Sequence, residues 1–556
     1  MLEKAKNPQF WQEVRNNPQY EWIIERVKKA YDDNRQDKIL NLSYYERVEC
    51  HKTGVRTNFD STYFSRRTWL ATTAILALIY PEEEKYIKEL HEIIWATCDE
   101  YSWALTAHTN GTIAVDTTQV DLDNAETALW LAEIRDILGE RLEPLIGERI
   151  DYEVHRRVFE NYKKGKFWWE AGENNWAAVC GGSVAGALMY LDPELFEELK
   201  PRLLKTLNAF INTFPNDGTC LEGPSYCGYG FGNFIIFADL YNRYTKGEVE
   251  LLKGEKVKNI SCYMQRCFIK GNATVSFSDG HRNGKACAMI QYLLNKKFPE
   301  DVRILPPELL SVKTSSFSEC VRAFIYFDPE LPETPFKAED IYAKDAHQFT
   351  ANRDKYSFVI KGGHNSEPHN HNDIGSFILA DESGQVLCDI GAPLYTLQYF
   401  QNEHRYEHIC SSSLGHSVPI IDGKAQLAGW KRRGDLSYNA DGTVSVEISS
   451  AYDIEDLEKL TRNIVFGENS IKLTDSFNID SSRVTERFVT LIEPQIFESY
   501  VKIGNVKLLF DNKLCKVGLS TGEYTSVRPE SKLVTVYLID FEITSGLGDV
   551  SFEFEV

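Results

Sequence analysis

The densest cluster of reactive side chains lies between residues 364 and 416. Half of the twelve histidines of the chain fall in this stretch, which includes the run His369-Asn-His371. Successive side chains of a strand alternate between its two faces, so His369 and His371, two residues apart on an expected strand, can point into one site. Neighbouring strands could add Asp389 and His416. Imidazoles and a carboxylate are ligands that zinc prefers, so we expect the chemistry of this chain here.

A loop in the N-terminal part, over residues 216–230, is a second place where chemistry could lie. It holds Glu222, Tyr226 and Tyr229 among four glycines and a proline. By itself such a loop is more typical of a helix–helix turn with buried tyrosines. Its interest depends on what other loops bring to the same place.

Two further polar segments precede this loop. In Asn174-Asn175-Trp176, which opens an expected helix, either asparagine could be only the N-cap. His108 follows Trp103-Ala-Leu-Thr-Ala, and a single histidine of this kind more often bonds a backbone carbonyl than takes part in catalysis. Each segment alone favours a structural interpretation.

The elements that must position these groups change in type along the chain. Up to about residue 330, apolar residues recur with the helical period, and Pro and acidic residues open several segments. The expected helices cover residues 81–95, 125–138, 144–162, 177–190, 193–212 and 231–244. Serial helical hairpins of this kind indicate a toroid or a solenoid.

After about residue 335, short runs rich in β-branched residues alternate with turns. The expected strands cover residues 356–361, 376–380, 385–389, 444–448 and 534–539, and Asp381-Glu-Ser-Gly predicts a hairpin turn. A Pro-rich segment at 331–336 separates the two parts. The sequence therefore predicts a helical domain over 1–335 and an antiparallel β-sheet domain, stacked as a sandwich, over 336–556.

Composition and charge exclude several classes of partner. The chain has 556 residues with 82 acidic and 61 basic side chains, a net charge of −21, which argues against nucleic acid or an anionic membrane. No run approaches a membrane span, and no secretory signal is visible. Twelve scattered cysteines without a Cys-x-x-Cys pair read as reduced thiols, so we expect a cytoplasmic protein.

Taken together, the motifs resemble one known family. Their order is Trp-x4-His, Asn-Asn-Trp, Asp-Gly-x3-Glu-Gly-Pro-Ser-Tyr-x-x-Tyr, His-x-His-x-Asp-x-Gly-Ser-Phe and Asp-x-Gly, from about Trp103 to Gln426. This order resembles the heparinase II/III-like polysaccharide lyases. The resemblance implies an incomplete α/α toroid followed by antiparallel β-sheets, in agreement with the change from helices to strands.

The resemblance implies β-elimination at a uronic acid, within an acidic polysaccharide or oligosaccharide. The reaction needs a group that neutralises the sugar carboxylate, a base for the C5 proton and an acid for the departing O4. Asn175 is placed like the family's neutralising amide. Tyr226 resembles its catalytic tyrosine, the acid and, for one C5 epimer, also the base, while Tyr229 is close enough to compete for this role. His369 resembles the catalytic histidine, a base for the other epimer.

The resemblance also implies a metal and a set of residues around the substrate. His371, Asp389 and His416 match zinc ligands whose role in the family is structural. The other residues that fit substrate-binding positions are Asn174, Trp176, Glu222, Tyr229, His108 and Arg405. Arg66, Arg67 and Lys431 are further basic candidates only by position. The glycan, its sulfation and the number of subunits stay open, and a homo-oligomer is allowed.

Three alternatives stay open at the level of sequence. An alginate or oligoalginate lyase would use the same groups. A glycoside hydrolase would need two carboxylates flanking the bond, for which Glu173, Asp217 and Glu222 are available. A zinc-stabilised carbohydrate-binding protein would need the metal ligands but neither Tyr226 nor Asn175.

Overall fold

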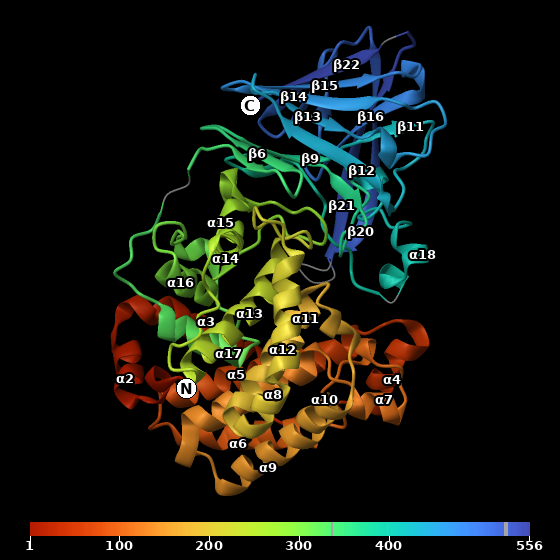
Figure 1. The fold of residues 1–556 in the computed structure, drawn as a ribbon. Coiled ribbons are helices and arrows are strands. Elements are labelled where there is room, and N and C mark those ends of the chain that lie inside the picture. Colours follow the sequence, from red (N-terminus) through yellow and green to blue (C-terminus); the bar gives the residue numbers. More distant parts are fainter. Residues whose placement is uncertain (40, 335–336, 397, 527–531, 547) are drawn as a thin grey trace. The chain divides into compact units, whose positions relative to one another are not determined.

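The computed structural model describes the chain apart from residues 40, 335–336, 397, 527–531 and 547 (Figure 1). Its contacts divide the chain into two units. Unit 1 comprises Met1–Thr213, Tyr226–Ser261 and Lys285–Thr334, and unit 2 comprises Phe214–Ser225, Cys262–Gly284 and Pro335–Val556. The domain limits 1–335 and 336–556 stay a prediction, and the contacts add two earlier segments to the C-terminal unit. Pro335 and Phe336, at the expected Pro-rich boundary, lie outside the described residues.

Unit 1 is built from helices (Figure 1). They are α1 (Glu3–Lys6), α2 (Pro8–Asn16), α3 (Glu21–Asn34), α4 (Tyr44–Thr53), α5 (Thr57–Ile79), α6 (Glu84–Asp99), α7 (Ile113–Thr118), α8 (Leu122–Leu138), α9 (Pro144–Val154), α10 (Glu160–Lys164), α11 (Asn175–Leu191), α12 (Pro193–Thr213), α13 (Pro224–Tyr244), α14 (Glu255–Ser261), α16 (Ala288–Lys297) and α17 (Phe317–Tyr326). A short parallel pair, β3 (Ala286–Cys287) and β4 (Leu310–Ser311), also belongs to this unit. The six expected helices are all present.

The core helix α11 packs against α8 and α12, and its small residues allow this close approach. A Cβ added at Gly186 would lie 2.7 Å from Leu129 on α8, and one at Gly182 would lie 3.2 Å from the carbonyl oxygen of Asn233 on α13. Close packing of this kind leaves no room for a methyl group. The glycines therefore allow α11 to pack closely against α8 and α13.

Three of the expected helices differ from the prediction in detail. The helix expected over 81–95 spans Glu84–Asp99, so Pro81 lies before it. The helix expected over 144–162 contains a π-helical turn at His155–Phe159, between α9 and α10. The helix expected from residue 231 begins seven residues earlier, because Pro224 is well suited to the first helical position. The 216–230 loop is therefore shorter than predicted, and Tyr226 and Tyr229 lie in the first two turns of α13.

Unit 2 is built from antiparallel sheets and contains the short helices α15 (Tyr263–Arg266) and α18 (Asn402–Arg405). A five-stranded sheet has the order β10 (Gly384–Leu387), β9 (Phe377–Asp381), β7 (Ser357–Lys361), β6 (Gln348–Asn352), β5 (Ile341–Ala343). A four-stranded sheet has the order β11 (Pro419–Ile421), β16 (Val484–Thr490), β21 (Lys532–Ile543), β20 (Cys515–Ser526). A nine-stranded sheet has the order β17 (Gln495–Ile496), β18 (Tyr500–Ile503), β19 (Val506–Leu509), β22 (Asp549–Glu555), β15 (Ser470–Phe477), β14 (Leu460–Phe466), β13 (Val444–Glu447), β12 (Gly429–Tyr438), β8 (Gly363–Asn365). The pair β1 (Phe268–Ile269) and β2 (Ala273–Thr274) completes the described strands of the unit.

The three larger sheets share one core. The ring of Phe377 on β9 lies 5.8 Å from that of Phe554 on β22 and 6.0 Å from that of Phe488 on β16. Buried and exposed residues alternate along β22, as expected for a strand with one face on the core. The predicted hairpin is confirmed, since Asp381 pairs with Gly384. Helices followed by stacked antiparallel sheets confirm the expected fold class. In the described residues, no helix has the length and apolar character needed to cross a membrane.

Candidate active site and metal centre

His369 and His371 lie in the loop between β8 and β9, and not on a strand as the sequence predicted. The backbone of His369 has a φ of 57°, in the left-handed region, so the alternation of side chains along a strand does not apply there. The two imidazoles nevertheless meet at one partner. Their proximity therefore comes from a shaped loop, with a histidine in a conformation that few residues adopt.

The shared partner is Asp279, which the sequence analysis did not single out. Its Oδ2 lies 2.8 Å from Nδ1 of His369, and its Oδ1 lies 3.0 Å from Nε2 of His371. The phenol of Tyr399 donates to Oδ1 at 2.6 Å. Because this carboxylate is buried, it holds both imidazoles in place through short contacts in a medium of low dielectric constant.

Arg405, which the sequence places near the substrate, is buried behind this carboxylate. Its guanidinium lies over the Tyr399 ring, 4.3 Å from the centroid, and one of its nitrogens is 3.5 Å from Oδ1 of Asp279. Burial alone would raise the pKa of Asp279, but hydrogen bonds from the two imidazoles, together with the charges of His369 and Arg405, hold it well below its usual range. Asp279 is therefore an anion, and it stabilises the tautomer of His369 whose Nε2 carries the lone pair.

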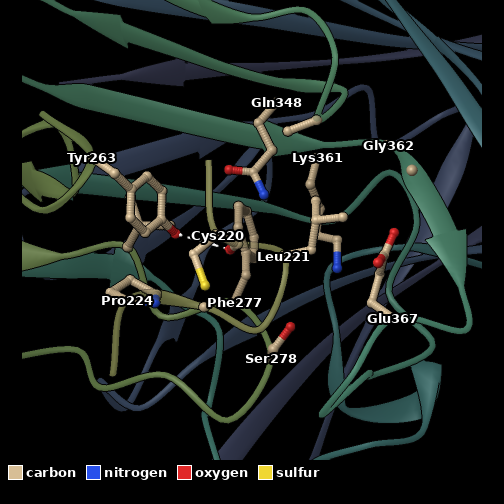
Figure 2. A pocket seen from close by; sticks show the side chains of 14 residues that line it. Cys220, Leu221, Pro224, Tyr263, Phe277, Ser278, Gln348, Lys361, Gly362 and Glu367 are labelled. Atoms are coloured by element: carbon tan, nitrogen blue, oxygen red, sulfur yellow. Dashed lines mark hydrogen bonds between the residues drawn. The ribbon is translucent and has the colours of Figure 1, made fainter. Parts of the chain in front are cut away.

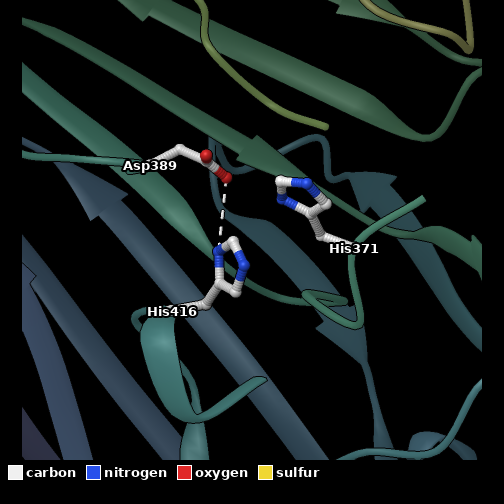
Figure 3. A group of neighbouring side chains, drawn as sticks. All are labelled: His371, Asp389 and His416. Carbon is white, nitrogen blue, oxygen red and sulfur yellow. Dashed lines mark ion pairs between the residues drawn. The ribbon is translucent and has the colours of Figure 1, made fainter. Parts of the chain in front are cut away.

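His371, Asp389 and His416 converge inside unit 2 (Figure 3). One ligand atom from each residue lies within 4.8 Å of the others, and all three side chains are fully buried. Asp389 follows strand β10, and His416 follows a 3₁₀ turn at Ser413–Gly415. The three residues predicted as metal ligands are thus brought together, from three separate segments of the chain.

The hydrogen bonds of these three residues fit a bound cation. Among the described residues, the inward Nδ1 of His371 is buried without a hydrogen-bond partner, and the inward Nδ1 of His416 and Oδ2 of Asp389 lie 3.3 Å apart as an ion pair without any further hydrogen bond (Figure 3). The outward atoms are all engaged: Nε2 of His371 by the carboxylate described above, Nε2 of His416 by the carbonyl oxygen of Cys410 at 2.8 Å, and Oδ1 of Asp389 by the amide of Gly391 at 2.8 Å. Metal ligands are commonly oriented by such outer hydrogen bonds, so the donor set suits a divalent cation.

A small pocket with a mixed polar and apolar lining lies beside this region in unit 2 (Figure 2). Tyr263 lies at one end and Glu367 at the other. Nζ of Lys361 donates to Oδ1 of Asp373 at 2.8 Å. Oε1 of Glu367 lies 3.0 Å from Nε2 of the His364 imidazole. Burial raises the pKa of Glu367 to about 7, although Lys361 and Arg433 act in the opposite direction. Lys361 and Glu367 therefore each have a partner within unit 2.

Asn174 and Asn175 have different positions at the start of α11. Asn174 is the N-cap, since its side chain accepts from the amide of Trp176 at 3.0 Å. Asn175 is the first helical residue and is buried. A Cβ added at Gly230 of α13 would lie 2.9 Å from Cβ of Asn175, so the two helices touch there. Tyr226 is four residues before Gly230 on the same face of α13, which therefore faces the start of α11.

Tyr229 has its phenol committed to a buried network of unit 1. It donates to Oε2 of Glu126 at 2.8 Å, and the amide of Asn233 contacts the other oxygen at 3.4 Å. Nζ of Lys313 lies 4.5 Å from the centroid of the Tyr229 ring. Burial, and then the charge of Glu126, raise the pKa of Tyr229 well above its usual range. These contacts make Tyr229 a poor proton acceptor.

His108 and Trp176 meet in unit 1, with ring centroids 4.7 Å apart, and Trp168 lies 4.9 Å from Trp176. Nδ1 of His108 lies 2.7 Å from Oδ2 of Asp121. Asp121 also accepts hydrogen bonds from the backbone amides of Leu105 and Asn124 and is the N-cap of α8, so its carboxylate has a structural role. The contacts place His108 in an aromatic group whose member Trp168 is 57% exposed.

The remaining candidates have mixed positions. Arg66 and Arg67 both pair with Glu100 inside unit 1, each at 2.7 Å. Glu222 is buried in the segment 214–225, which belongs to unit 2. Lys431 is exposed on β12. The two arginines are thus structural ion-pair partners, and only Lys431 of these four is available to solvent.

Comparison of the fold with solved structures finds polysaccharide lyases. Heparinase III matches with a TM-score of 0.64 and 13% identity, covering 100% of this chain and 91% of that one. A heparan sulfate lyase from Pedobacter heparinus matches with a TM-score of 0.61 and 13% identity, covering 100% and 86%. The chondroitin AC lyase of Streptomyces coelicolor A3, solved with chondroitin sulphate, has a TM-score of 0.58 and 8% identity, covering 100% and 82%. This chain has a heparinase III-like fold.

The comparison confirms the fold that the motif resemblance implied. At these identities the likeness concerns the fold. No protein-family model matches the sequence, and no curated protein matches it either.

Sequence reasoning missed two members of the histidine cluster. Asp279 stands in Phe277-Ser-Asp-Gly, which has the form of an ordinary turn, and Tyr399 lies in a 3₁₀ turn at Gln398–Phe400. The only signal was a carboxylate near the end of the helical part, 90 residues before its partner His369. Such a pairing depends on the tertiary fold.

Proposed function

We propose that this chain is a polysaccharide lyase that cleaves glycans containing uronic acid by β-elimination. The observation that carries the proposal is the contact between Asp279 and His369, which prepares one imidazole as a base beside a buried set of metal ligands. The heparinase III-like fold supports the same reaction class, because the similar structures are lyases of heparan sulfate and chondroitin type. The substrate is an acidic polysaccharide or an oligosaccharide derived from one.

Three residues act on the sugar in this proposal. Asn175 donates hydrogen bonds to the uronate carboxylate, which takes up negative charge when the C5 proton leaves. His369 accepts that proton on Nε2 for one C5 epimer, and Tyr226 accepts it for the other as a phenolate, after its own proton has passed to solvent. Tyr226 donates its proton to O4 as the C4–O4 bond breaks and the C4–C5 double bond forms. Tyr226 is preferred to Tyr229 because the phenol of Tyr229 is held by Glu126.

The metal is proposed to be zinc with a structural role. His371, Asp389 and His416 would hold it, and two imidazoles with one carboxylate are a usual donor set for this ion. The bound ion would tie the histidine loop to the end of β10 and to the segment before β11. His371 shares Asp279 with His369, so this link would also fix the orientation of the proposed base.

The hydrolase alternative has less support from the available carboxylates. Oδ2 of Asp217 accepts from the amides of Asp345 and Ala346 at 2.8 and 3.0 Å, and Oδ1 accepts from Thr219 at 3.0 Å. A carboxylate with this many backbone donors acts as a turn cap. Glu173 is exposed in unit 1, while Glu222 is buried in unit 2.

A substrate panel tests the proposal. Heparan sulfate, chondroitin sulfate, hyaluronan and alginate are incubated with the protein after zinc has been supplied. Elimination creates a double bond conjugated to the carboxylate, which absorbs in the ultraviolet, so at least one of the four should give a rising absorbance. New reducing ends without this absorbance would indicate a hydrolase. Binding without any cleavage would indicate a carbohydrate-binding protein, and a response to alginate alone would narrow the substrate to that glycan.

A further inference from the structure

Strand β12 carries an irregularity next to the histidine loop in unit 2. It pairs with β8 through Gly429↔Asn365 and Arg433↔His364, and the register shifts between these two pairs. Because Asn365 and His364 are adjacent on β8, the residues Trp430 to Arg432 of β12 have no partner residue on β8 and form a bulge. A bulge of this kind turns side chains out of the ladder, and bulges are frequent next to active sites.

The bulge presents an exposed aromatic ring with basic groups around it. Trp430 is 62% exposed, and the guanidinium carbon of Arg433 lies 5.1 Å from its ring centroid. The His364 ring is 5.6 Å away at an angle of 72°. Lys431 is exposed beside them. We call Trp430, Lys431 and Arg433 the Trp430 patch.

The charges of the Trp430 patch take part in no ion pair among the described residues. In the part of the chain that the structure describes, neither Lys431 nor Arg433 has a carboxylate within ion-pair distance, whereas Arg432 is held by the carbonyl oxygen of Tyr452 at 2.8 Å and by Asp453 at 3.3 Å. The protein as a whole has a net charge of −21. The charge of Arg433 acts on the Glu367 carboxylate only from a distance. At an exposed tryptophan, the cations of Lys431 and Arg433 form a local attraction for anions on an acidic surface.

The Trp430 patch is joined to the histidine loop by a hydrogen-bonded residue. Oε1 of Gln426 accepts from the amide of Ile374 at 3.0 Å and from the side chain of Asn365 at 3.1 Å. Its Nε2 donates to the carbonyl oxygen of Ile374 at 2.8 Å, and Asn372 donates to its carbonyl oxygen at 3.3 Å. The segment that leads into the bulge is thus fixed to the loop that carries His369.

The geometry points to a binding subsite for an acidic sugar at the Trp430 patch, outside the residues that act in the reaction. An indole offers a flat apolar face for a pyranose ring, and Arg433 and Lys431 offer charge-assisted hydrogen bonds to a sulfate or carboxylate. Arg433 keeps its planar fork available while it stacks on the indole. The occupant is a sugar of the same anionic chain that is cleaved, some residues away from the cleaved bond. This inference rests on the proposed function.

The test uses binding and turnover together. Trp430→Ala and Arg433→Gln are compared with wild type. Tyr45→Ala serves as the control, because Tyr45 is an exposed aromatic residue outside the patch, on α4 of unit 1. The ligands are size-fractionated oligosaccharides of the four glycans of the panel, with a neutral oligosaccharide for comparison. Each patch variant should weaken binding of long oligosaccharides by about tenfold, with a smaller effect on disaccharides. The loss should fall on KM, and Arg433→Gln should reduce the salt dependence of binding.

Several results would overturn the subsite. If both variants had the KM of the wild type for long substrates, the subsite would be rejected and the lyase proposal would remain. A shift of the sedimentation coefficient in Trp430→Ala, with unchanged glycan binding, would show that the patch is instead an interface between two copies of the chain. Patch-dependent binding of long acidic oligosaccharides without any unsaturated product would keep the subsite and reject the lyase.

Discussion

The carboxylate of Asp279 and the imidazole of His369 are joined by a contact of 2.8 Å, although 90 residues separate them in the chain. The same carboxylate reaches His371 through its other oxygen at 3.0 Å. One buried anion thus orients both the proposed base and a proposed metal ligand. The two proposed roles of the histidine loop are therefore coupled through Asp279.

Asp279→Asn tests this coupling. The amide keeps the shape of the side chain but loses the charge that favours one tautomer of His369, so kcat should fall by about a hundredfold with a smaller change in KM. Zinc affinity should fall as well, because His371 loses its acceptor. Both are measured by steady-state kinetics and metal analysis of the same sample. Asp453→Asn, at an exposed carboxylate, is the control, and normal kcat in Asp279→Asn would remove the positioning role.

His371→Ala should lower both the zinc content and the melting temperature. The substitution removes one of three donors and leaves Asp389 and His416 buried without compensation. The expected loss is about 3 kcal/mol of unfolding free energy. Metal analysis and calorimetry measure the two effects. His404→Ala, at a half-exposed histidine of the same region, should change neither. Unchanged bound zinc in His371→Ala would contradict the ligand set.

Tyr226→Phe and Tyr229→Phe should behave in opposite ways. Without its phenol, Tyr226 has no proton to give to O4, so turnover should be lost while the melting temperature stays near that of wild type. In Tyr229→Phe, Glu126 loses a hydrogen bond in a buried position, which should cost about 1–3 kcal/mol of stability with activity largely kept. Kinetics and thermal unfolding of both variants decide the matter. Normal turnover in Tyr226→Phe would transfer the role to Tyr229.

Glu367 should give unfolding a specific pH dependence. Its pKa is raised from 4.5 to about 7, so between these values the folded state binds more protons than the unfolded state. Stability therefore falls as the pH rises through this range, by up to about 3 kcal/mol from this group. Glu367→Gln should be more stable than wild type near pH 8, and the advantage should shrink toward pH 5. Chemical denaturation across this range measures it, and a constant difference would contradict the assignment.

The division into helices and strands could be predicted because it depends on local periodicity. The helix at Ala125–Leu138 and the hairpin at Asp381 follow from patterns within a few residues. The start of α13 was placed too late, because its glycines are poor helix formers. Gly230 is tolerated there because α13 must approach Asn175 closely. That reason belongs to packing and is invisible in the local sequence.

The metal ligands could be proposed because their residue types and motifs are distinctive. His371, Asp389 and His416 were named from the sequence, and the structure brings them together. The reason given for the proximity of His369 and His371 was wrong, since a left-handed residue in a loop replaces the expected strand. Asp279 could not be predicted, because an Asp-Gly turn has the same local sequence whether or not its carboxylate contacts a histidine in the folded protein.

The central claim is that the glycosidic bond breaks by elimination, and the masses of the products test it most directly. A defined acidic oligosaccharide is cleaved to completion, and the masses of both fragments are measured by mass spectrometry. Elimination predicts that the two masses sum to that of the substrate, with the unsaturated fragment lighter by one water than its saturated counterpart. Fragments that together exceed the substrate by one water would contradict the account.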